Sequence, residues 1–326
     1  MKNILITGIS GQDGVFLSKK LLLEEEDLKI VGISRQDKTS IYNKLQYLGV
    51  ESSLFRKVSI FNLNLEKSDE VKQFLKDQKF NYVYNLTGPS SIYKSINNEY
   101  DSKLINIIFD NLTNSLIQQK NLCNFFQASS SEMFAQNETG LFNENSEMRP
   151  RSPYATAKYK NHKKVLNLRK EYEWNITSGI LFNHESEFRG DEFLIKKIIN
   201  SAIRIKKNKQ NSLVLGSTSL VRDWSYASDI CEAIHLINTT NSNSHYVVGS
   251  GRGTSIGEVV KYIFNYLDLN FEKYLEIDIS LLRRDDPGTI ICDNKKLIND
   301  LKWKPQVSLE KMLEKILKFR LSDHPI

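Results

Sequence analysis

A tyrosine and a lysine four residues apart are the first candidates for chemistry in this sequence. Tyr154 and Lys158 lie in the run SPYATAK at 152–158. In a helix, residues four apart project from one face, so both side chains would reach the same substrate. A free tyrosine, with a pKa of about 10, is a poor base at neutral pH, but a nearby ammonium favours the phenolate and lowers that pKa. The pair predicts proton transfer on a hydroxyl group, with Lys158 also able to hold a nicotinamide ribose.

A polar segment upstream of this pair supplies further candidates. It reads Ala128-Ser129-Ser130-Ser131-Glu132 and ends an apolar run typical of a buried strand. Ligands of open parallel sheets bind beyond the carboxyl ends of the strands. Ser130 is then placed to hydrogen-bond a reacting hydroxyl, and Glu132 to act as acid or base. Serines at such a position also serve in loops or as helix N-caps, an alternative that fits Ser129 and Ser131 better than Ser130.

Near the N-terminus, glycines with the spacing GxxGxxG lie between a predicted strand and a predicted helix. They are Gly8, Gly11 and Gly14, with Gln12 and Asp13 before the last. Glycine permits a tight turn and a close approach of the backbone to a pyrophosphate, and the helix N-terminus adds free N–H groups. We expect these five residues to hold a dinucleotide; the alternative is a plain tight turn.

The end of the second predicted strand bears on the choice between NAD and NADP. NAD-binding proteins usually place Asp or Glu there, to hold the ribose 2′-hydroxyl. This chain has Ser34-Arg35-Gln36 instead. A carboxylate would repel a 2′-phosphate, whereas Arg35 can pair with it and stack on the adenine. We therefore predict NADP as the cofactor; the alternative is that Arg35 is only a surface cation.

Short apolar runs alternate with helical patterns in the first half of the chain. Strands are expected at 2–7, 29–34, 58–60, 82–86 and 125–129, and helices at 15–23, 68–78 and 104–119. This alternation predicts an α/β fold with a Rossmann-type, doubly wound parallel sheet.

The second half is less regular and predicts a smaller, interleaved α/β domain that faces the substrate. Strands are expected at 177–182 and 244–248, and helices at 195–207 and 256–267. We predict an NADP-binding domain over 1–175, joined by about 223–250, and a sugar-nucleotide-binding domain over 176–222 and 251–326.

The composition excludes several classes of protein. No apolar stretch in the 326 residues approaches the about 20 needed to cross a bilayer, and no signal peptide is expected. Cys123, Cys231 and Cys292 are odd in number and far apart, which predicts buried thiols and neither a disulfide nor a metal site. We expect a cytoplasmic protein with no membrane partner.

The formal charge of +6 is partly concentrated between Lys196 and Lys209. This stretch is either a solvated helix face or a wall that attracts a phosphorylated ligand. No aromatic interleaving or nucleic-acid-binding motif accompanies it, so no nucleic-acid partner is predicted.

Together these motifs resemble the extended short-chain dehydrogenase/reductases, and within them most closely the GDP-mannose 4,6-dehydratase family. The resemblance runs nearly end to end, through TGISGQDGVFL at 7–17, QASSSEMF at 127–134, PRSPYATAK at 150–158, GILFNHES at 179–186, RDWSYASD at 222–229 and DLKWKP at 300–305. The GQDG and FNHES stretches are its most specific parts.

The resemblance implies a hydro-lyase mechanism. Tyr154 would remove the proton of the sugar 4-hydroxyl, positioned by Ser130, while NADP⁺ takes the hydride from C4. Glu132 would then remove the C5 proton, water would leave from C6, and the hydride would return to C6. The product would be a 4-keto-6-deoxy sugar nucleotide, a precursor for polysaccharide biosynthesis.

The resemblance also implies which residues bind the ligands. A GDP-sugar would be held by Ser90, Asn183, Lys197, Arg222 and one of Arg283 or Arg284, since arginine donates paired hydrogen bonds to a diphosphate. NADP would further contact Asn64, Leu65 and His184. A homodimer or homotetramer is expected.

Departures from the family pattern concentrate where the sugar should lie. Ser130 replaces the usual threonine, Asn64 an aspartate and Ala135 a glycine, and the loop NLTGPSSI at 85–92 lacks the usual histidine. These changes leave the sugar open between GDP-mannose and a heptose, GDP-manno-heptose. A 4-keto reductase or epimerase on the same fold is the second hypothesis, and a non-enzymatic dinucleotide-binding scaffold the third. Glu132 favours the dehydratase, because only elimination across C5–C6 requires a base for C5.

Overall fold

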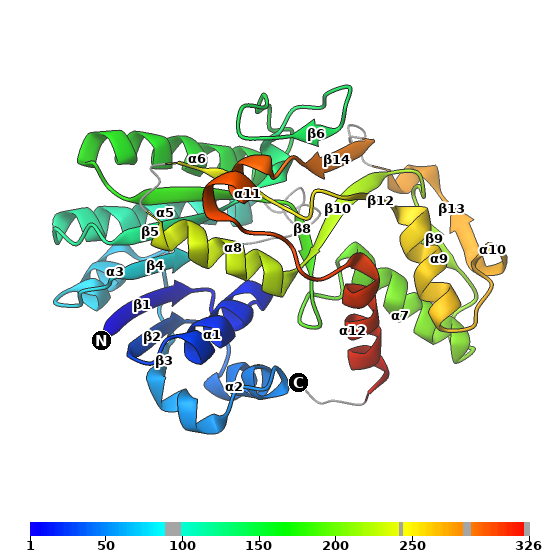
Figure 1. Cartoon of the computed structure of the whole chain (residues 1–326), viewed down its shortest axis with the longest axis horizontal. Helices are drawn as coiled ribbons and strands as arrows, with labels where there is room; N and C mark the ends of the chain where they lie inside the picture. The colour runs from blue at the N-terminus through cyan, green and yellow to red at the C-terminus, as the bar shows by residue number, and fades with distance from the viewer. Residues whose placement is uncertain (89–98, 241–243, 283–287, 323–326) are drawn as a thin grey trace.

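The computed structural model describes residues 1–88, 99–240, 244–282 and 288–322. Ser90, Arg283 and Arg284, all predicted to bind the sugar nucleotide, lie outside this part of the chain. The described residues form two sheet-based layers, with the N-terminal half of the chain on one side and most of the C-terminal half on the other (Figure 1).

A parallel sheet of seven strands carries the first layer, in the order β11-β7-β5-β4-β1-β2-β3. Its strands are β1 (Lys2–Thr7), β2 (Leu28–Ile33), β3 (Val58–Phe61), β4 (Tyr82–Asn85), β5 (Asn124–Ser130), β7 (Ile176–Leu181) and β11 (Tyr246–Val248). Every neighbouring pair is parallel. The strand order reverses between β1 and β4, and the crevice at such a reversal is the usual ligand site of a doubly wound sheet.

Helices cover both faces of this sheet. They are α1 (Gln12–Glu24), α2 (Lys38–Tyr47), α3 (Ser68–Leu75), α5 (Glu99–Gln118), α6 (Pro153–Tyr172) and α8 (Ala227–Thr239), with the 3₁₀ turns η1 (Ser52–Lys57) and η2 (Ser131–Met133). α1 packs with α2 and α8 on one face, and α3, α5 and α6 pack together on the other. α6 begins where Ser152 caps the helix, with Pro153 at the first helical position, and this start sets the orientation of Tyr154.

The second layer contains a smaller mixed sheet, ordered β12-β10-β14-β6 with β8 paired to β10, and a two-stranded sheet of β9 and β13. Its strands are β6 (Leu141–Phe142), β8 (Asn183–Glu185), β9 (Leu213–Leu215), β10 (Val221–Tyr226), β12 (Gly253–Ser255), β13 (Leu275–Ile277) and β14 (Thr289–Cys292). Its helices are α7 (Leu194–Lys206), α9 (Ile256–Tyr266), α10 (Phe271–Tyr274), α11 (Lys295–Leu301) and α12 (Leu309–Leu321), with the 3₁₀ turn η3 (Ile279–Leu281).

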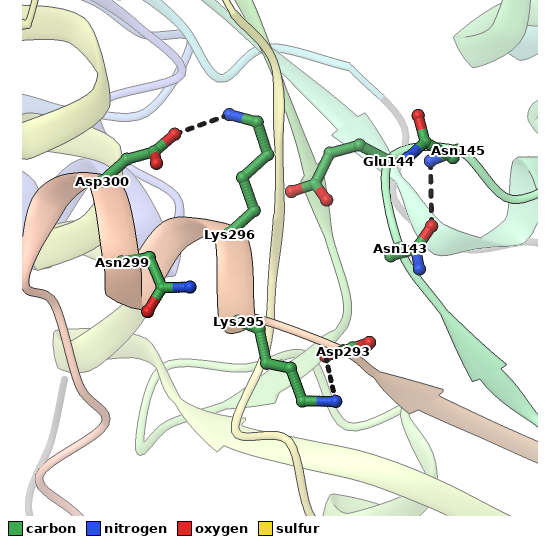
Figure 2. A pocket seen from close by; sticks show the side chains of 8 residues that line it. All are labelled: Asn143, Glu144, Asn145, Asp293, Lys295, Lys296, Asn299 and Asp300. Atoms are coloured by element: carbon green, nitrogen blue, oxygen red, sulfur yellow. Dashed lines mark hydrogen bonds and ion pairs between the residues drawn. The ribbon is translucent and has the colours of Figure 1, made fainter.

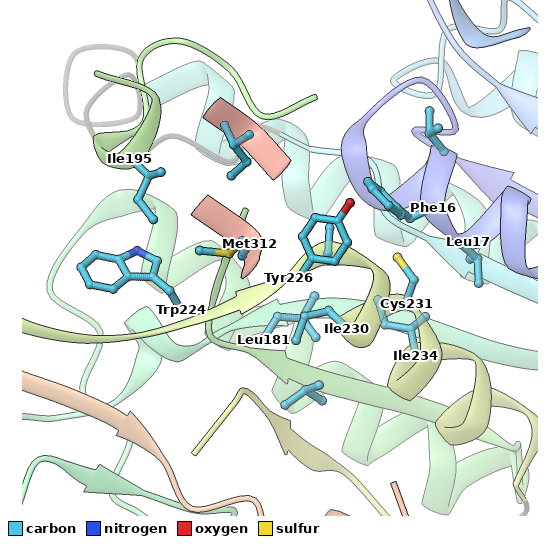
Figure 3. Packing of buried hydrophobic residues seen from close by; sticks show 14 of the residues in the cluster. Phe16, Leu17, Leu181, Ile195, Trp224, Tyr226, Ile230, Cys231, Ile234 and Met312 are labelled. Atoms are coloured by element: carbon cyan, nitrogen blue, oxygen red, sulfur yellow. The ribbon is translucent and has the colours of Figure 1, made fainter. Parts of the chain in front are cut away.

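One continuous apolar core joins the layers. Figure 3 shows Phe16 of α1, Cys231 of α8, Trp224 and Tyr226 of β10 and Met312 of α12 within it. Phe16 meets Tyr226 edge to face at 5.3 Å between ring centroids. The helix that starts at the glycine loop is therefore packed directly against the second layer.

Two buried aspartates fasten the C-terminal segments to this core. The Asp229 carboxylate accepts the N–H groups of Gln306 and Val307, each at 2.9 Å, and its carbonyl accepts the indole N–H of Trp303 at 3.1 Å. Asp223 accepts the N–H groups of Gly251 and Cys292. The bonds of Asp229 thus join RDWSYASD at 222–229 to DLKWKP at 300–305, two segments that lie far apart in the sequence.

The strands predicted for the first half are present, each within one residue of its predicted bounds, and the Rossmann-type sheet is confirmed. One predicted boundary is wrong: 176–181 was expected in the substrate domain, but it forms β7, paired between β5 and β11 of the seven-stranded sheet. Every residue of β7 is buried, because helices cover both of its faces. The rest of the predicted domain division stays a prediction.

Within the described ranges, no helix is long and apolar enough to cross a membrane. The cysteines Cys123, Cys231 and Cys292 are free thiols and buried, as predicted. In the same ranges, no group of three or more His, Cys, Asp or Glu side chains is arranged to hold a metal ion.

Candidate active site

The glycine loop lies between β1 and α1, at the reversal of strand order. Gly8 has φ of +73°, and a Cβ there would lie 3.0 Å from the carbonyl oxygen of Leu86. At Gly14, a Cβ would lie 2.5 Å from the Cα of Ile9. Gly11 occupies the N-cap of α1 and has no side chain to satisfy the first helical N–H groups. The loop is therefore a close-packed backbone cradle at a helix N-terminus, a setting suited to a pyrophosphate.

The side chains of Gln12 and Asp13 tie this loop to β8. Gln12 donates from Nε2 to the carbonyl of His184 at 3.0 Å and accepts the Ser186 hydroxyl at 2.8 Å. Asp13 pairs with Nε2 of His184 at 3.0 Å. Gln12, Asp13 and His184 were predicted to contact the cofactor. In the structure, the side chains of Gln12 and Asp13 instead bond to residues 184 and 186, and the side chain of His184 bonds to Asp13. Contact with a cofactor through their backbone stays a prediction.

The pKa values of Asp13 and His184 shift in the directions expected of an ion pair. Burial opposes the charged form of each, but the partner's charge and hydrogen bond outweigh it. The pKa of Asp13 is therefore lowered and the pKa of His184 is raised. The glycine loop is thus held to β8 by a largely buried charge pair.

Residues at the end of β2 and β3 surround the expected adenine end of this cradle. Arg35 is exposed in the turn after β2. Asn64 is exposed, and its side-chain oxygen accepts the N–H of Glu66 at 3.0 Å, whereas Leu65 is buried. Lys44 of α2, which sequence reasoning missed, donates to the carbonyl of Ser10 in the glycine loop at 3.0 Å.

Tyr154 and Lys158 lie on one face of α6, as predicted, and both are buried. The predicted effect of Lys158 on Tyr154 is wrong for this structure. Burial raises the pKa of Tyr154 to about 12; a hydrogen bond with Ser130 lowers it, and the charge of Glu132 raises it. The Lys158 ammonium lies 5.7 Å from the centre of the Tyr154 ring. It donates instead to the carbonyl of Ala128 at 2.9 Å, and its own pKa is lowered by burial to about 8.

A buried hydrogen-bond chain, not predicted from the sequence, leads from β1 to this lysine. Thr7 donates to Asn85 at 2.7 Å, and Asn85 donates to Gln127 at 2.7 Å. Gln127 then donates to the carbonyl of Ala128 at 2.9 Å, the same oxygen that accepts from Lys158. The chain crosses three adjacent strands, so the glycine-loop strand and Lys158 are held in one polar network.

The sequence left two roles open for Ser130, an N-cap and a residue that faces the reacting hydroxyl, and the structure fits both. Its hydroxyl accepts the N–H of Glu132 at 3.3 Å and caps η2. The same residue lowers the pKa of Tyr154, so its hydroxyl lies near the phenol. Ser129 turns the other way and donates to the sulfur of Met133 at 3.2 Å. Ser130 is therefore the serine of this run that faces the tyrosine.

Glu132 opens into a small pocket that also contains Asn183 and Arg222, two of the predicted diphosphate ligands. Ser131, Phe182, Asp223 and Ile290 complete its lining. Arg222 is buried and donates to the carbonyls of Val221 at 2.8 Å and Gly288 at 3.3 Å. The structure thus places a carboxylate, an amide and a guanidinium around one small space beyond β5.

Lys197 does not line this pocket. It is exposed on α7 and donates to the carbonyl of Val214 at 3.1 Å. Its neighbour Lys196 is buried, with 1% of its surface exposed, and donates to the carbonyl of Glu187 at 2.7 Å. Burial and the charge of Arg320 lower the pKa of Lys196 to about 8. The basic stretch is therefore neither a uniform solvated face nor a uniform cationic wall.

Arg189 was missed by sequence reasoning, although it lies three residues after the FNHES motif. Its guanidinium stacks 3.5 Å from the centre of the Phe193 ring and lies 3.8 Å from Glu185. Its charge lowers the pKa of both Tyr154 and Asp13, after the larger effects of burial and of the direct hydrogen-bond partners. Arg189 is thus within electrostatic reach of the glycine loop and of the tyrosine.

A second, larger pocket lies away from these residues, between the loop after β6 and α11 (Figure 2). Its charges are paired within the protein, Lys296 with Asp300 at 2.9 Å and Lys295 with Asp293 at 3.6 Å. Glu144 in its wall accepts the N–H of Val247 at 2.9 Å. This pocket contains none of the predicted site residues.

Comparison with known proteins decides the family. The model of the family described as GDP-mannose 4,6 dehydratase matches residues 5–316. The chain belongs to this family. GDP-mannose 4,6 dehydratase 2 of Arabidopsis thaliana is 31% identical over 325 residues, covering 96% of this chain and 85% of the relative. The resemblance predicted from the motifs is confirmed.

Solved structures share the fold of this family member. RMD from Pseudomonas aeruginosa, complexed with NADPH, has a TM-score of 0.78 at 20% identity and covers 98% of this chain and 97% of its own. DesIV, a dTDP-glucose 4,6-dehydratase from Streptomyces venezuelae with NAD and TYD bound, has a TM-score of 0.84 at 16% identity, with coverage of 98% and 97%. At these identities the likeness concerns the fold alone.

Proposed function

We propose that this protein is an NADP-dependent hydro-lyase that converts a GDP-sugar, with GDP-mannose as the first candidate, to its 4-keto-6-deoxy derivative. The observation that carries the proposal is the grouping of Tyr154, Ser130 and Glu132 at the end of β5, in a chain of the GDP-mannose 4,6-dehydratase family. Oxidoreduction at C4 requires the first two residues, and elimination requires the third.

The residues present fit a phosphorylated dinucleotide. The glycine loop admits no Cβ at Gly8 or Gly14, because each would clash with the neighbouring backbone, so the tight turn that precedes α1 requires these glycines. Gly11 leaves the N-terminus of α1 without a side-chain cap. The first residues after β2 are Ser34 and Arg35 rather than a carboxylate, which favours a 2′-phosphate. When bound, NADP supplies the acceptor for the C4 hydride and the donor of the hydride to C6.

Tyr154 and Ser130 handle the 4-hydroxyl. Ser130 accepts or donates a hydrogen bond to hold that hydroxyl, while Tyr154 takes its proton. With a pKa of about 12, Tyr154 is protonated in the ligand-free structure. Its action as a base therefore requires a cation nearer to the ring than Lys158 lies at 5.7 Å, or a stronger hydrogen bond to the phenolate oxygen.

Glu132 serves the elimination. A ketone at C4 acidifies the C5 hydrogen, and the Glu132 carboxylate is the acid–base group in the pocket beside Asn183 and Arg222. The proton taken from C5 and the hydroxide leaving C6 together make the lost water. Arg222 and Asn183 then hold the guanosine diphosphate, a role that we also propose for Lys197 and one of Arg283 or Arg284. Ser90 is proposed as a further substrate-binding residue.

The deciding experiment incubates the purified protein with GDP-mannose and a catalytic amount of NADP⁺, with mass spectrometry of the sugar nucleotide. We expect the loss of one water and no net accumulation of NADPH. GDP-manno-heptose forms the second arm, because the altered loop at 85–92 bears on the size of the sugar. No change in any GDP-hexose or GDP-heptose would refute the proposal. Stoichiometric NADPH consumption on a 4-keto sugar would favour a reductase instead.

We also propose a homodimer or homotetramer. α5 exposes the large apolar side chains of Tyr100 and Ile107, at 55% and 37% of their surface, on the outer face of the first layer. Light scattering after size-exclusion chromatography would give the mass directly, and a monomer at micromolar concentration would contradict this expectation. A cytoplasmic location and a role in polysaccharide biosynthesis stay predictions.

A further inference from the structure

Within the described residues, Lys44, a cation near the glycine loop, contacts only neutral partners. Lys44 of α2 reaches back toward the sheet and donates from Nζ to the carbonyl of Ser10 at 3.0 Å. The same nitrogen lies 3.5 Å from the side-chain oxygen of Gln36 and 5.9 Å from the centre of the Phe188 ring. It therefore bridges the two segments, the glycine loop and the turn after β2, between which the adenosine end of a dinucleotide must lie.

The charge of this lysine is uncompensated. Lys44 is half-buried, and in the described parts of the chain no carboxylate forms an ion pair with it. The two nearest carboxylates in the sequence have other partners. Asp37 accepts the N–H of Thr39 at 2.9 Å and caps α2, and Glu51 accepts the Ser53 hydroxyl at 3.3 Å. A half-buried ammonium without a counter-charge is expensive to keep desolvated, and an anionic ligand would relieve that cost.

We infer that Lys44 is a specificity-determining residue which, together with Arg35, takes the 2′-phosphate that distinguishes NADP from NAD. Arg35 approaches from the exposed side of the turn, and Lys44 approaches from α2 on the side of the glycine loop. Two cations from different elements can then share one phosphate, whose dianion matches their combined charge. The inference rests on the proposed use of NADP and extends it to a residue outside the predicted binding motif.

The test measures binding rather than turnover. Isothermal titration calorimetry on the purified protein would compare NADP⁺ with NAD⁺, and 2′,5′-ADP with 5′-AMP. Lys44→Met should weaken NADP⁺ and 2′,5′-ADP by about 10- to 100-fold, the usual loss for one charge-assisted hydrogen bond. NAD⁺ and 5′-AMP should change by less than about twofold, because they carry no 2′-phosphate. Lys44→Arg should retain the preference.

Lys29→Met is the matched control. It removes the same charge from the opposite end of β2, where Lys29 is exposed, and should leave all four affinities unchanged. Equal weakening of NADP⁺ and NAD⁺ by Lys44→Met would overturn the inference, since it would show that Lys44 only supports the glycine loop. An unchanged preference would overturn it as well. A wild-type protein that prefers NAD⁺ would instead refute the proposed cofactor, before any variant is measured.

Discussion

The cofactor side and the sugar side of this site differ in how far the protein itself fixes their side chains. On the cofactor side, Gln12 and Asp13 are bonded to β8, and the chain from Thr7 to Gln127 is closed at every step. On the sugar side, the exposed Asn183 and the half-buried Glu132 face a small pocket.

This difference indicates a division of labour. A dinucleotide is the same molecule in every turnover, so a preorganised cradle lowers the cost of binding it. A sugar must be discriminated, and discrimination depends on a few side chains that face it. Among the departures from the family pattern, Ser130 belongs to the sugar side, whereas Asn64 belongs to the cofactor side. The comparison therefore predicts large catalytic effects on the sugar side and combined stability and binding effects on the cofactor side.

The largest effect is expected at Glu132. Glu132→Gln removes the base for C5 while keeping the shape of the side chain, so dehydration should fall by about 100- to 10,000-fold. NADP⁺ affinity should be unchanged, because Glu132 opens toward Asn183 and Arg222. Mass spectrometry of the product and calorimetry of the cofactor measure the two quantities. Glu138→Gln, the same change at an exposed residue, is the control. A loss of NADP⁺ affinity in Glu132→Gln but not in Glu138→Gln would contradict the assignment of Glu132 to the sugar side.

The next largest effect is expected from Asp13→Asn, which removes the charge of Asp13 from its pair with His184 on the cofactor side. The pKa of His184 is raised in the folded protein, so the stability from this pair is complete below the ordinary histidine value and is lost as pH rises through the raised pKa. The lowered pKa of Asp13 makes the same contribution vanish in acid, as pH falls through that pKa. Asp13→Asn should therefore cost about 3 kcal/mol in the free energy of unfolding near pH 5.5 and less near pH 9.

Urea unfolding of the wild type and Asp13→Asn at both pH values would measure this difference. The comparison between the two proteins cancels the titration of groups that they share. Asp77→Asn, at an exposed residue beyond the end of α3, is the control. A pH-independent cost would show that the pair acts as a neutral hydrogen bond rather than as charges.

Local sequence patterns were sufficient for the parts of the site that lie within one element. Tyr154 and Lys158 share a helix face because their spacing matches the helical period, and the glycines of the loop lie within seven residues. The buried strands were predictable because their apolar runs are short and are bounded by polar turns. α8 was not among the predicted helices; the structure packs it between α1 and the sheet.

The rest depends on contacts between distant residues. Asp13 and His184 lie 171 residues apart in the chain, and nothing in either segment identifies the other as its partner. The pKa of Tyr154 was predicted in the wrong direction, because the dominant cause is burial by the complete fold rather than its neighbour in the helix. Lys196 lies in a basic stretch that suggested solvent, yet α7 turns it inward to the carbonyl of Glu187.

A smaller effect is expected from Gln127→Leu, which opens the buried chain that holds the Ala128 carbonyl. Asn85 loses its acceptor, and the carbonyl that receives Lys158 loses a second donor. We expect kcat to fall by about 10-fold and the free energy of unfolding by about 2 kcal/mol. NADP⁺ affinity should hold within about threefold, since the cradle itself is intact. Gln118→Leu, at the exposed last residue of α5, is the control. An unchanged kcat in Gln127→Leu would show that this hydrogen-bond chain does not contribute to catalysis.

The smallest effect is expected at Lys197, a proposed ligand of the sugar nucleotide. Its exposed side chain donates to the carbonyl of Val214 and lies outside the pocket of Glu132. If it contributes to the diphosphate from α7, Lys197→Met should raise the KM for GDP-mannose by about threefold to 10-fold, with kcat unchanged, because exposed ion pairs contribute little. Lys207→Met, one residue beyond α7, should leave both constants unaltered. A fall in kcat with an unchanged KM would contradict a binding role and place Lys197 with the residues that shape the transition state.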